Sequence, residues 1–270
     1  MQVRSLSGST TFRDTFGDIS AGASRWRLWL NLAWHDLRVR YRRTWLGLWW
    51  VALSFALFAG VKIVIFGPLA SRPIGEYAAS LALGFLVFRF IANSITGGSS
   101  VFVGAQKWIH SEPLPLSLHV FKLTAMNLMV LGFASMAAFA ICLGFGVYHA
   151  AVLPAIPAAL LVYAINGLWV SVLIGALCAR HRDVLHLVGT IVQVSYFATP
   201  ILWIPPETGF RAKVALYNPL THYIAILREP MLDGTVPALS WMIVGGVTVS
   251  GLVVTLLVFR FVRQRIIFWI

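Results

Sequence analysis

The side chains best suited to chemistry in this sequence lie inside long apolar runs. Arg89 is the one charge deep within such a run, and a guanidinium at that depth attracts a phosphate or an acidic sugar. Trp169, Tyr196 and Phe197 also lie within apolar runs, and their rings offer flat faces on which sugars stack. Pairing of Arg89 with a backbone carbonyl and packing of the rings between helices are the alternatives. The sequence therefore indicates an aromatic passage for a glycan, with helix packing as the competing explanation.

Motifs for catalysis and nucleotide binding are absent from the sequence. A P-loop requires a lysine followed by Ser or Thr, whereas the four lysines are followed by Ile, Trp, Leu and Val. There is no His-Glu-x-x-His motif or paired Cys and His spacing for zinc, and Cys142 and Cys178 are interpreted as small buried hydrophobic residues. The long apolar runs contain no Asp or Glu for a proton-coupled carrier. We therefore expect no catalytic residue, metal or cofactor in this chain, and uphill transport would need energy from another chain.

The composition of the chain is typical of a membrane protein. Of 270 residues, 59% are hydrophobic and 11% are charged, whereas about a quarter are charged in a soluble domain. The mean hydropathy is +0.82. The net charge of +12 is sparse and lies between apolar runs, so it indicates basic loops beside a membrane and no nucleic-acid partner.

The apolar runs predict an all-α integral membrane protein that forms a single domain over residues 1–270. A helix needs about 20 apolar residues to cross the hydrocarbon core. Six predicted transmembrane helices meet this need, at residues 45–66, 77–97, 123–147, 152–179, 184–204 and 240–260. Fifteen basic residues lie on one side of these spans and four on the other, which predicts that both termini are cytoplasmic. Residues 1–24 are expected to be a flexible cytoplasmic N-terminus.

Two segments on the cytoplasmic side are expected to be structured. Residues 25–43 carry one apolar helical stripe with arginines elsewhere, which favours an amphipathic interface helix over a plain basic anchor. Residues 106–122 begin with a compact amphipathic stretch around Trp108, which suits docking of a soluble partner better than a featureless loop.

One segment on the outer side is expected to form a gate region. Residues 205–235 are too long for a simple turn and too apolar for a solvated loop. Short helices that re-enter the membrane are therefore predicted there. Irregular backbone at such depth is tolerated only where protein or a water-filled cavity covers it, so a re-entrant segment indicates a pathway.

Four stretches, taken in order, resemble the membrane subunit of bacterial polysaccharide ABC exporters, the permease family for O-antigen, capsule and teichoic acid. They are DLRVRYRRTWLGLWW from Asp36, ARHRDVLHLVGTIVQVSYFATPILW from Ala179, YNPLTHYIAILREPML from Tyr217 and RQRIIFWI from Arg263. The resemblance extends over residues 25–270. The LPLS stretch and the closing RIIFWI are closest to O-antigen permeases, whereas Phe88-Arg89 is similar to capsule-type relatives.

The resemblance implies a homodimer in the bacterial cytoplasmic (inner) membrane, in contact with lipid and bound to two copies of a separate cytoplasmic ABC ATPase. ATP and Mg²⁺ would bind to that ATPase, and an undecaprenyl-diphosphate-linked polysaccharide would cross between the two subunits. Residues implied in ATPase docking are Asp36, Arg40, Gln106, Lys107, Trp108, Ile109 and Glu112. The lipid diphosphate would enter beside Arg38, Arg40, Arg42 and Arg43. The implied translocation pathway includes Arg89, Trp169, Tyr196, Phe197 and Trp203, and the implied outer gate includes Pro205, Tyr217, Pro219, Tyr223 and Arg228.

Other functions stay open on the sequence alone. A capsule or teichoic-acid exporter, or a drug or lipid exporter permease, would share the same fold. A membrane glycosyl or phospho-sugar transferase would need acidic side chains at the membrane face to hold a metal or act as a base. The inner candidates for this role are Asp36 and Asp183, and each lies beside arginines. A passive channel is disfavoured by the predicted docking segment.

Overall fold

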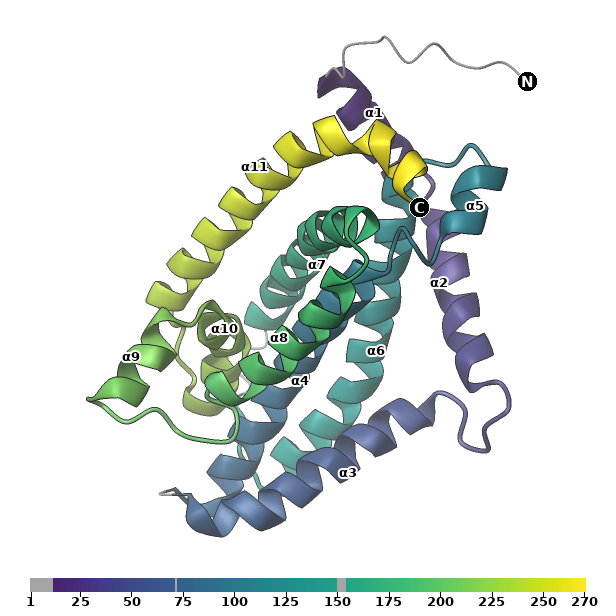
Figure 1. Ribbon diagram of the computed structural model, residues 1–270. Coiled ribbons are helices and arrows are strands. Elements are labelled where there is room, and N and C mark those ends of the chain that lie inside the picture. The colour runs from purple at the N-terminus through teal and green to yellow at the C-terminus, as the bar shows by residue number, and fades with distance from the viewer. Residues whose placement is uncertain (1–11, 71, 150–153) are drawn as a thin grey trace.

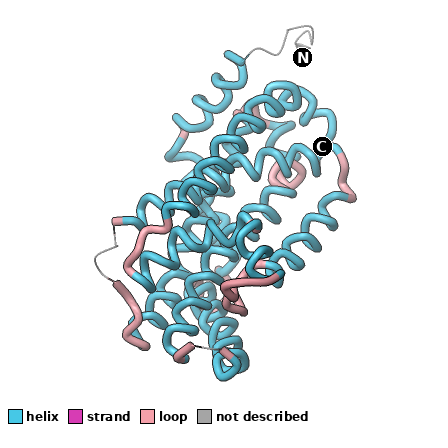
Figure 2. Tube along the Cα trace, turned by 90° about the vertical axis from the view of Figure 1, so that its left-hand side faces the viewer, coloured by secondary structure: helices cyan, strands magenta, loops and turns pink. Residues whose placement is uncertain are grey.

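The computed structural model is a bundle of α-helices in which residues 12–70, 72–149 and 154–270 are described. The described residues contain no β-strand, and Figure 2 shows short loops joining the helices. In chain order the helices are α1 (Phe12–Ser24), α2 (Trp26–Tyr41), α3 (Trp49–Phe66), the 3₁₀ helix η1 (Gly67–Leu69), α4 (Ile74–Ser99), α5 (Gln106–Ser111), α6 (Leu116–Gly144), α7 (Ala155–Arg180), α8 (Val184–Ala198), α9 (Phe210–Tyr217), α10 (Pro219–Asp233) and α11 (Ala238–Trp269) (Figure 1).

The bundle has two distinct ends. Helices α1 and α5 lie at the end that holds the C-terminus, which we call the terminal end, whereas η1, α9 and α10 lie at the far end (Figure 1). The described chain thus starts and finishes at the same end. The expected flexible segment 1–24 forms helix α1 over its described part, and residues 1–11 lie outside the described residues.

Five helices are long and apolar enough to cross a membrane: α3 continued by η1, α4, α6, α7 and α11. The fifth predicted span, 184–204, is helical only as far as Ala198, because Pro200 disfavours helical backbone at the residue before it. Helix α8 has 15 residues and is about 22 Å long, short of a hydrocarbon core of about 30 Å. It runs from the terminal end towards the far end (Figure 1), but the six-span count stays a prediction.

The other predicted spans are confirmed as helices with different limits. Helix α6 begins at Leu116, seven residues before the prediction, and α11 continues through the basic tail to Trp269. The fourth predicted span began at residues 152–153, which lie outside the described residues; the rest of it is α7. The predicted interface segment 25–43 is confirmed as a helix, α2, and its position in a membrane interface stays a prediction.

Helix α4 forms the centre of the bundle and packs against α3, α6, α7, α8 and α10. Its crossing with α7 brings two backbones unusually close, because Gly98 of α4 faces the backbone of Ser171 in α7. A Cβ added at Gly98 would lie 2.7 Å from the Ser171 Cα, and one added at Gly175 would lie 2.9 Å from the Gly98 carbonyl oxygen. Small residues at such crossings let transmembrane helices gain packing contacts that lipid cannot provide.

Helix α1 is held at the terminal end by Asp18, which caps the start of α6. Its carboxylate accepts hydrogen bonds from the backbone N–H groups of Leu116 (3.2 Å) and Ser117 (3.0 Å), and the Ser117 hydroxyl donates to the Asp18 carbonyl (2.8 Å). Arg263 of α11 lies 3.7 Å from the same carboxylate. The first N–H groups of a helix have no partner within it, so Asp18 satisfies two of them and joins α1, α6 and α11.

Replacing Asp18 with alanine is expected to destabilise the protein by about 1–2 kcal/mol, the usual cost of losing a helix cap. The Asp18 side chain is only 7% exposed, so solvent screens this interaction little. Thermal unfolding in detergent should show a lower midpoint, and limited proteolysis should cleave α1 faster. The exposed Asp233 at the far end supplies the matched control, since Asp233→Ala should change stability by less than about 0.5 kcal/mol. Equal midpoints for the two variants would contradict the capping role.

Candidate functional site

Helices α3, α4 and α8 converge on a cluster of aromatic side chains: Phe55, Phe85, Phe88, Tyr196 and Phe197, called here the aromatic cluster. The Phe55 and Phe85 rings stack with centroids 5.2 Å apart. The Tyr196 ring meets Phe85, Phe88 and Phe197 edge-on, at 6.2, 5.1 and 5.5 Å. Phe197 is 69% exposed, so the cluster opens outward from α8. Two of the predicted pathway residues, Tyr196 and Phe197, therefore lie together.

Lys62 of α3 lies over the aromatic cluster. Its Nζ is 3.5 Å from the Phe85 ring centroid and 4.7 Å from that of Tyr196. The face of an aromatic ring attracts a cation, so these rings hold the ammonium group within the bundle. Lys62 is not among the predicted site residues. The signal was the spacing of seven residues between Phe55 and Lys62, which places both on one face of a helix.

Arg89 follows Phe88 of the aromatic cluster on α4. It lies close enough to Lys62 for the two charges to repel each other, and its other electrostatic neighbour is Tyr41. Among the described residues it has no hydrogen-bond or ion-pair partner. It lines a small cavity between α4 and α6 together with Asn93 and Asn127. Arg89, predicted from the sequence as a charge deep in a span, thus has a second cation, Lys62, in its neighbourhood.

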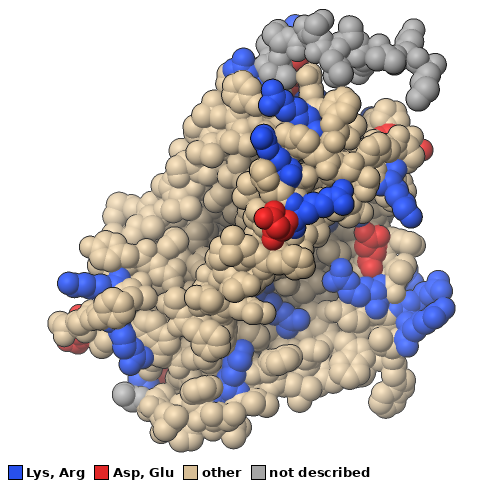
Figure 3. Space-filling model, in the orientation of Figure 1, with Lys and Arg blue, Asp and Glu red and all other residues tan. Residues whose placement is uncertain are grey.

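The face of the molecule next to this site is hollowed. Figure 3 shows a hollow between α8 and α3 with basic side chains inside it. Basic side chains also gather over the terminal end and along the side of α2, with a smaller group at the far end (Figure 3). A single subunit therefore presents an open, partly charged concavity lined by apolar helices.

Trp203 and Trp169, the other predicted pathway residues, lie in different places. The Trp203 indole donates a hydrogen bond to the Phe197 carbonyl (3.1 Å), so Trp203 adjoins the aromatic cluster. The Arg211 guanidinium lies 4.8 Å from the Trp203 ring. Trp169 is part of a separate network inside the bundle. Whether either residue touches a substrate stays a prediction.

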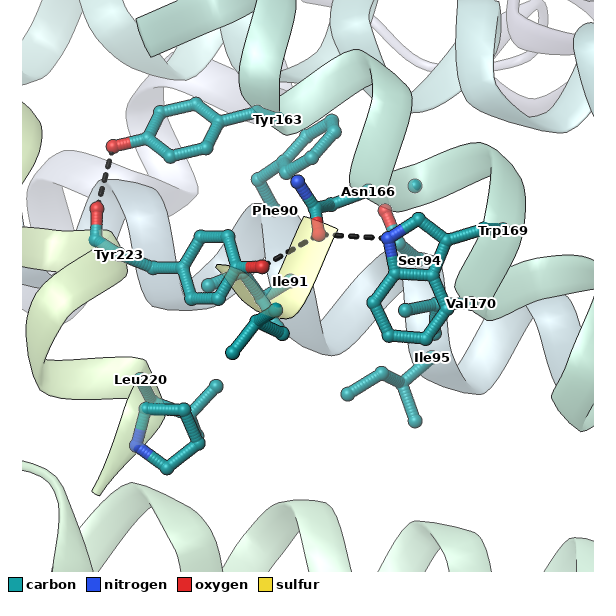
Figure 4. Close-up of a pocket in the computed structure, with 13 residues that line it drawn as sticks. Phe90, Ile91, Ser94, Ile95, Tyr163, Asn166, Trp169, Val170, Leu220 and Tyr223 are labelled. Carbon is teal, nitrogen blue, oxygen red and sulfur yellow. Dashed lines mark hydrogen bonds between the residues drawn. The ribbon is translucent and has the colours of Figure 1, made fainter. Parts of the chain in front are cut away.

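That separate network is centred on Asn166 of α7 (Figure 4). Its amide oxygen accepts hydrogen bonds from the Tyr223 hydroxyl (2.5 Å) and the Trp169 indole (2.8 Å). Its amide nitrogen donates to the Thr248 hydroxyl (2.8 Å) and the Val162 carbonyl (2.8 Å). The network borders an apolar pocket of ≈ 190 Å³ and joins α7 to α10 and α11.

The predicted outer gate residues lie at the far end, where α9 and α10 confirm the expected short helices. Pro219 begins α10, and Tyr223 on the same helix is buried. The Arg228 guanidinium donates a hydrogen bond to the Pro200 carbonyl (3.0 Å), which ties α10 to the end of α8. Tyr217 is 81% exposed and Pro205 is half-buried in the loop before α9. Re-entry of these helices into a membrane stays a prediction.

Parts of both predicted docking segments, on α2 and α5, line one groove at the terminal end. It measures ≈ 750 Å³ and lies between α2, α5, the end of α4 and the start of α6. Asp36, Arg40 and Trp108 line it, and Asp36 pairs with Lys122 at 2.8 Å. His119 also lines it, with an Nε2 atom that has no hydrogen-bond partner among the described residues.

The remaining predicted docking residues divide into two groups. Gln106, Lys107 and Glu112 are exposed beside Trp108, whereas Ile109 turns inward and packs against the core at the terminal end. The sequence did predict an amphipathic element here, and helix α5 confirms it. The four arginines predicted to meet a lipid diphosphate, Arg38, Arg40, Arg42 and Arg43, are all exposed on α2 or just after it.

The part of the chain that the structure describes meets the requirements of neither a metal site nor a disulfide. Its His, Cys, Asp and Glu residues form no group of three or more that could hold a metal ion. Cys142 and Cys178 are buried and unpaired, in agreement with the sequence interpretation.

Comparison with curated proteins agrees with this architecture. A protein of Myxococcus xanthus named O-antigen export system permease protein RfbA is 24% identical over 224 residues, which cover 79% of this chain and 85% of that protein. Two proteins of the same name from Klebsiella pneumoniae are 25% and 23% identical, over 74% and 82% of this chain and 78% and 85% of their own lengths. No protein-family model matches the chain. The resemblance to permease subunits of O-antigen ABC exporters is thereby confirmed.

Proposed function

We propose that this relative of the O-antigen permeases is the transmembrane subunit of an ATP-driven exporter for an undecaprenyl-diphosphate-linked polysaccharide. The chain is a multi-pass membrane protein of the inner membrane, and both termini would face the cytoplasm. The observation that supports the proposal most directly is the aromatic cluster with Lys62, whose residues come from α3, α4 and α8.

A second copy of the chain would complete the channel. The aromatic cluster comes from helices that border or adjoin the hollow between α8 and α3, and Phe197 of that cluster is 69% exposed. Two such faces placed together would enclose rings from both subunits. Sugar rings stack on aromatic side chains without requiring one particular hydroxyl pattern, so a lined channel suits a repeating polymer. Membrane lipid would cover the remaining apolar surface.

A separate ABC ATPase would supply the energy at the terminal end. Helix α5 presents Trp108 and its charged neighbours outward, and the groove between α5 and α2 could seat an element of that partner. ATP and Mg²⁺ would bind to the ATPase. Its cycle would favour one of two states of the channel only through contacts that differ between those states. The lipid diphosphate would approach the exposed arginines of α2, where guanidinium groups pair with phosphate oxygens.

The function is tested by expressing the tagged chain in a strain that makes the glycan. A strain that lacks this chain should make finished glycan and retain it inside the cell. Absence of the glycan from that strain would instead favour a transferase. The native protein should copurify with an ABC ATPase at a one-to-one ratio. Reconstitution of the two should give ATP-dependent movement of lipid-linked glycan. Recovery without any ATPase, or with enzymes of glycan synthesis alone, would overturn the proposal.

A substitution in helix α5 tests whether this helix docks the ATPase. Trp108→Glu should reduce copurified ATPase about tenfold, because it replaces a large apolar contact with a charge. The matched control is Trp26→Glu on α2, since Trp26 is 52% exposed and Trp108 is 53% exposed. That control should keep its ATPase within about twofold of the unchanged protein, as expected for a side chain outside a contact surface. Equal loss in both variants would contradict docking through α5.

A further inference from the structure

Lys62 and Arg89 are two cations inside membrane-spanning helices, and both lack an acidic partner. Each lies within a helix that is long and apolar enough to cross a membrane. No ion pair or hydrogen bond to either side chain occurs within the described residues; the contacts of Lys62 are the rings of Phe85 and Tyr196. The five N–H donors of the Arg89 guanidinium are thus without a protein acceptor in the described structure.

No carboxylate on the surrounding helices is placed to relieve this charge. Helices α3, α6, α7 and α8 contain no Asp or Glu, and α4 contains only Glu76, in its first turn. The carboxylates of α10, Glu229 and Asp233, interact with Arg228 on the same helix. Thirteen residues of helix separate Glu76 from Arg89, which is about 20 Å along the axis. Two like charges at membrane depth repel each other and lose solvation, so they are stable only beside water or an anion.

We propose that Lys62 and Arg89 together bind an anionic group of the exported glycan, either a phosphate of its lipid diphosphate or a carboxylate of an acidic sugar. This inference rests on the proposed export function and assigns recognition of the anionic group of that substrate to Lys62 and Arg89. A phosphate and a carboxylate each offer a pair of anionic oxygen atoms. A guanidinium or an ammonium group binds such a pair through charge-assisted hydrogen bonds.

The position of Lys62 couples this anion to sugar stacking. In the structure its ammonium group lies on the face of Phe85 at 3.5 Å, where a sugar ring would otherwise stack. An anion near Arg89 would attract Lys62 away from the ring and neutralise the repulsion between the two cations. The face of Phe85 that Lys62 covers would then be free for sugar, while the opposite face stays stacked on Phe55. A neutral glycan without its lipid diphosphate has no group that releases Lys62, so the aromatic cluster would bind it poorly.

The test measures ligand binding to the full-length chain in phosphatidylcholine nanodiscs, whose lipids carry no net charge. The probes are geranyl diphosphate for the lipid head, tetragalacturonate for an acidic sugar and maltotetraose for a neutral one. At least one anionic probe should bind about tenfold more tightly than maltotetraose, as a charge-assisted contact predicts. Lys62→Met and Arg89→Gln should each weaken that probe about tenfold, whereas Lys62→Arg should retain it. The exposed Lys213 and Arg72 provide matched controls, Lys213→Met and Arg72→Gln, which should stay within about twofold.

A stability readout separates binding from folding. Because Lys62→Met removes an uncompensated charge from the bundle, its thermal midpoint should rise, whereas a structural role for Lys62 would lower it. Unchanged binding of both anionic probes in Lys62→Met and Arg89→Gln, or equal binding of maltotetraose, would overturn the anion site. Those results would leave export itself intact. Failure of the unchanged protein to transport glycan with its ATPase would instead overturn the proposed function.

Discussion

Replacing Gly98 with valine is expected to prevent the protein from reaching its folded state. The added side chain would have to enter the space of the Ser171 backbone, since even a Cβ would lie 2.7 Å from the Ser171 Cα. Backbone cannot rotate away as a flexible side chain can, so α4 and α7 would have to separate. We expect a loss of about 3 kcal/mol or more, above the usual range for an overpacked core. Fluorescence-detected size-exclusion chromatography should show little monodisperse protein.

Gly132 of α6 provides the matched control, because nothing lies within 4 Å of a Cβ built there. Gly98 is the last residue but one of α4, and Gly132 lies in the middle of α6. Valine is a better helix former than glycine, so helix propensity does not explain a loss at Gly98. Gly132→Val should give nearly unchanged yield and thermal midpoint. A monodisperse Gly98→Val protein with the midpoint of the unchanged protein would refute the close crossing of α4 and α7.

Asn166→Leu is the second substitution expected to have a large effect. It would leave the Tyr223 hydroxyl and the Trp169 indole without their shared acceptor in a buried apolar setting. Each such unsatisfied group costs about 1–3 kcal/mol, although hydrogen bonds inside membranes average nearer the lower value. A total loss of about 2–4 kcal/mol should appear as a lower thermal midpoint. Helix α10 should loosen first, because Tyr223 is its link to Asn166.

Two further variants show whether the hydrogen bonds cause this loss. Asn93→Leu removes an amide that has no hydrogen-bond partner among the described residues, so it should cost much less than Asn166→Leu. Tyr223→Phe combined with Asn166→Leu should cost less than the two changes added together, with a coupling of about 1 kcal/mol. Full additivity would mean that the bond between these side chains contributes nothing.

Local patterns predicted the helices of this protein well. Helix α2 occupies residues 26–41, within two residues of the predicted 25–43 at each end, because its apolar stripe is readable from neighbouring positions. The limit of the fifth predicted span was less accurate, since apolarity continued to residue 204 while the backbone left the helix at Ala198. Pro200 gives that signal in the sequence. The helical α1 was not expected, because its packing against α6 is a contact between distant residues.

The candidate site was only partly predictable for a similar reason. Arg89, Tyr196 and Phe197 stand out because each lies in an apolar run where its type is unusual. Lys62 lies near the end of its run, where a lysine ordinarily extends to the interface. Its contact with Phe85 depends on how α3 crosses α4. Periodicity within one helix predicts which residues share a face, but it does not predict how two helices cross. The same holds for Trp169, whose indole is already bonded inside the bundle.

The meeting of α1, α6 and α11 at the terminal end also sets the order in which the protein can be completed. Asp18 leaves the ribosome early, whereas Arg263 and the buried Ile266 are among the last residues synthesised. The core that joins Ile19, Leu116 and Ile266 therefore cannot close until the last helix has been inserted. A chain truncated by premature termination would expose this unfinished junction to proteases at the terminal end. Quality control of the nascent chain would thus act at the same end at which the ATPase is proposed to dock.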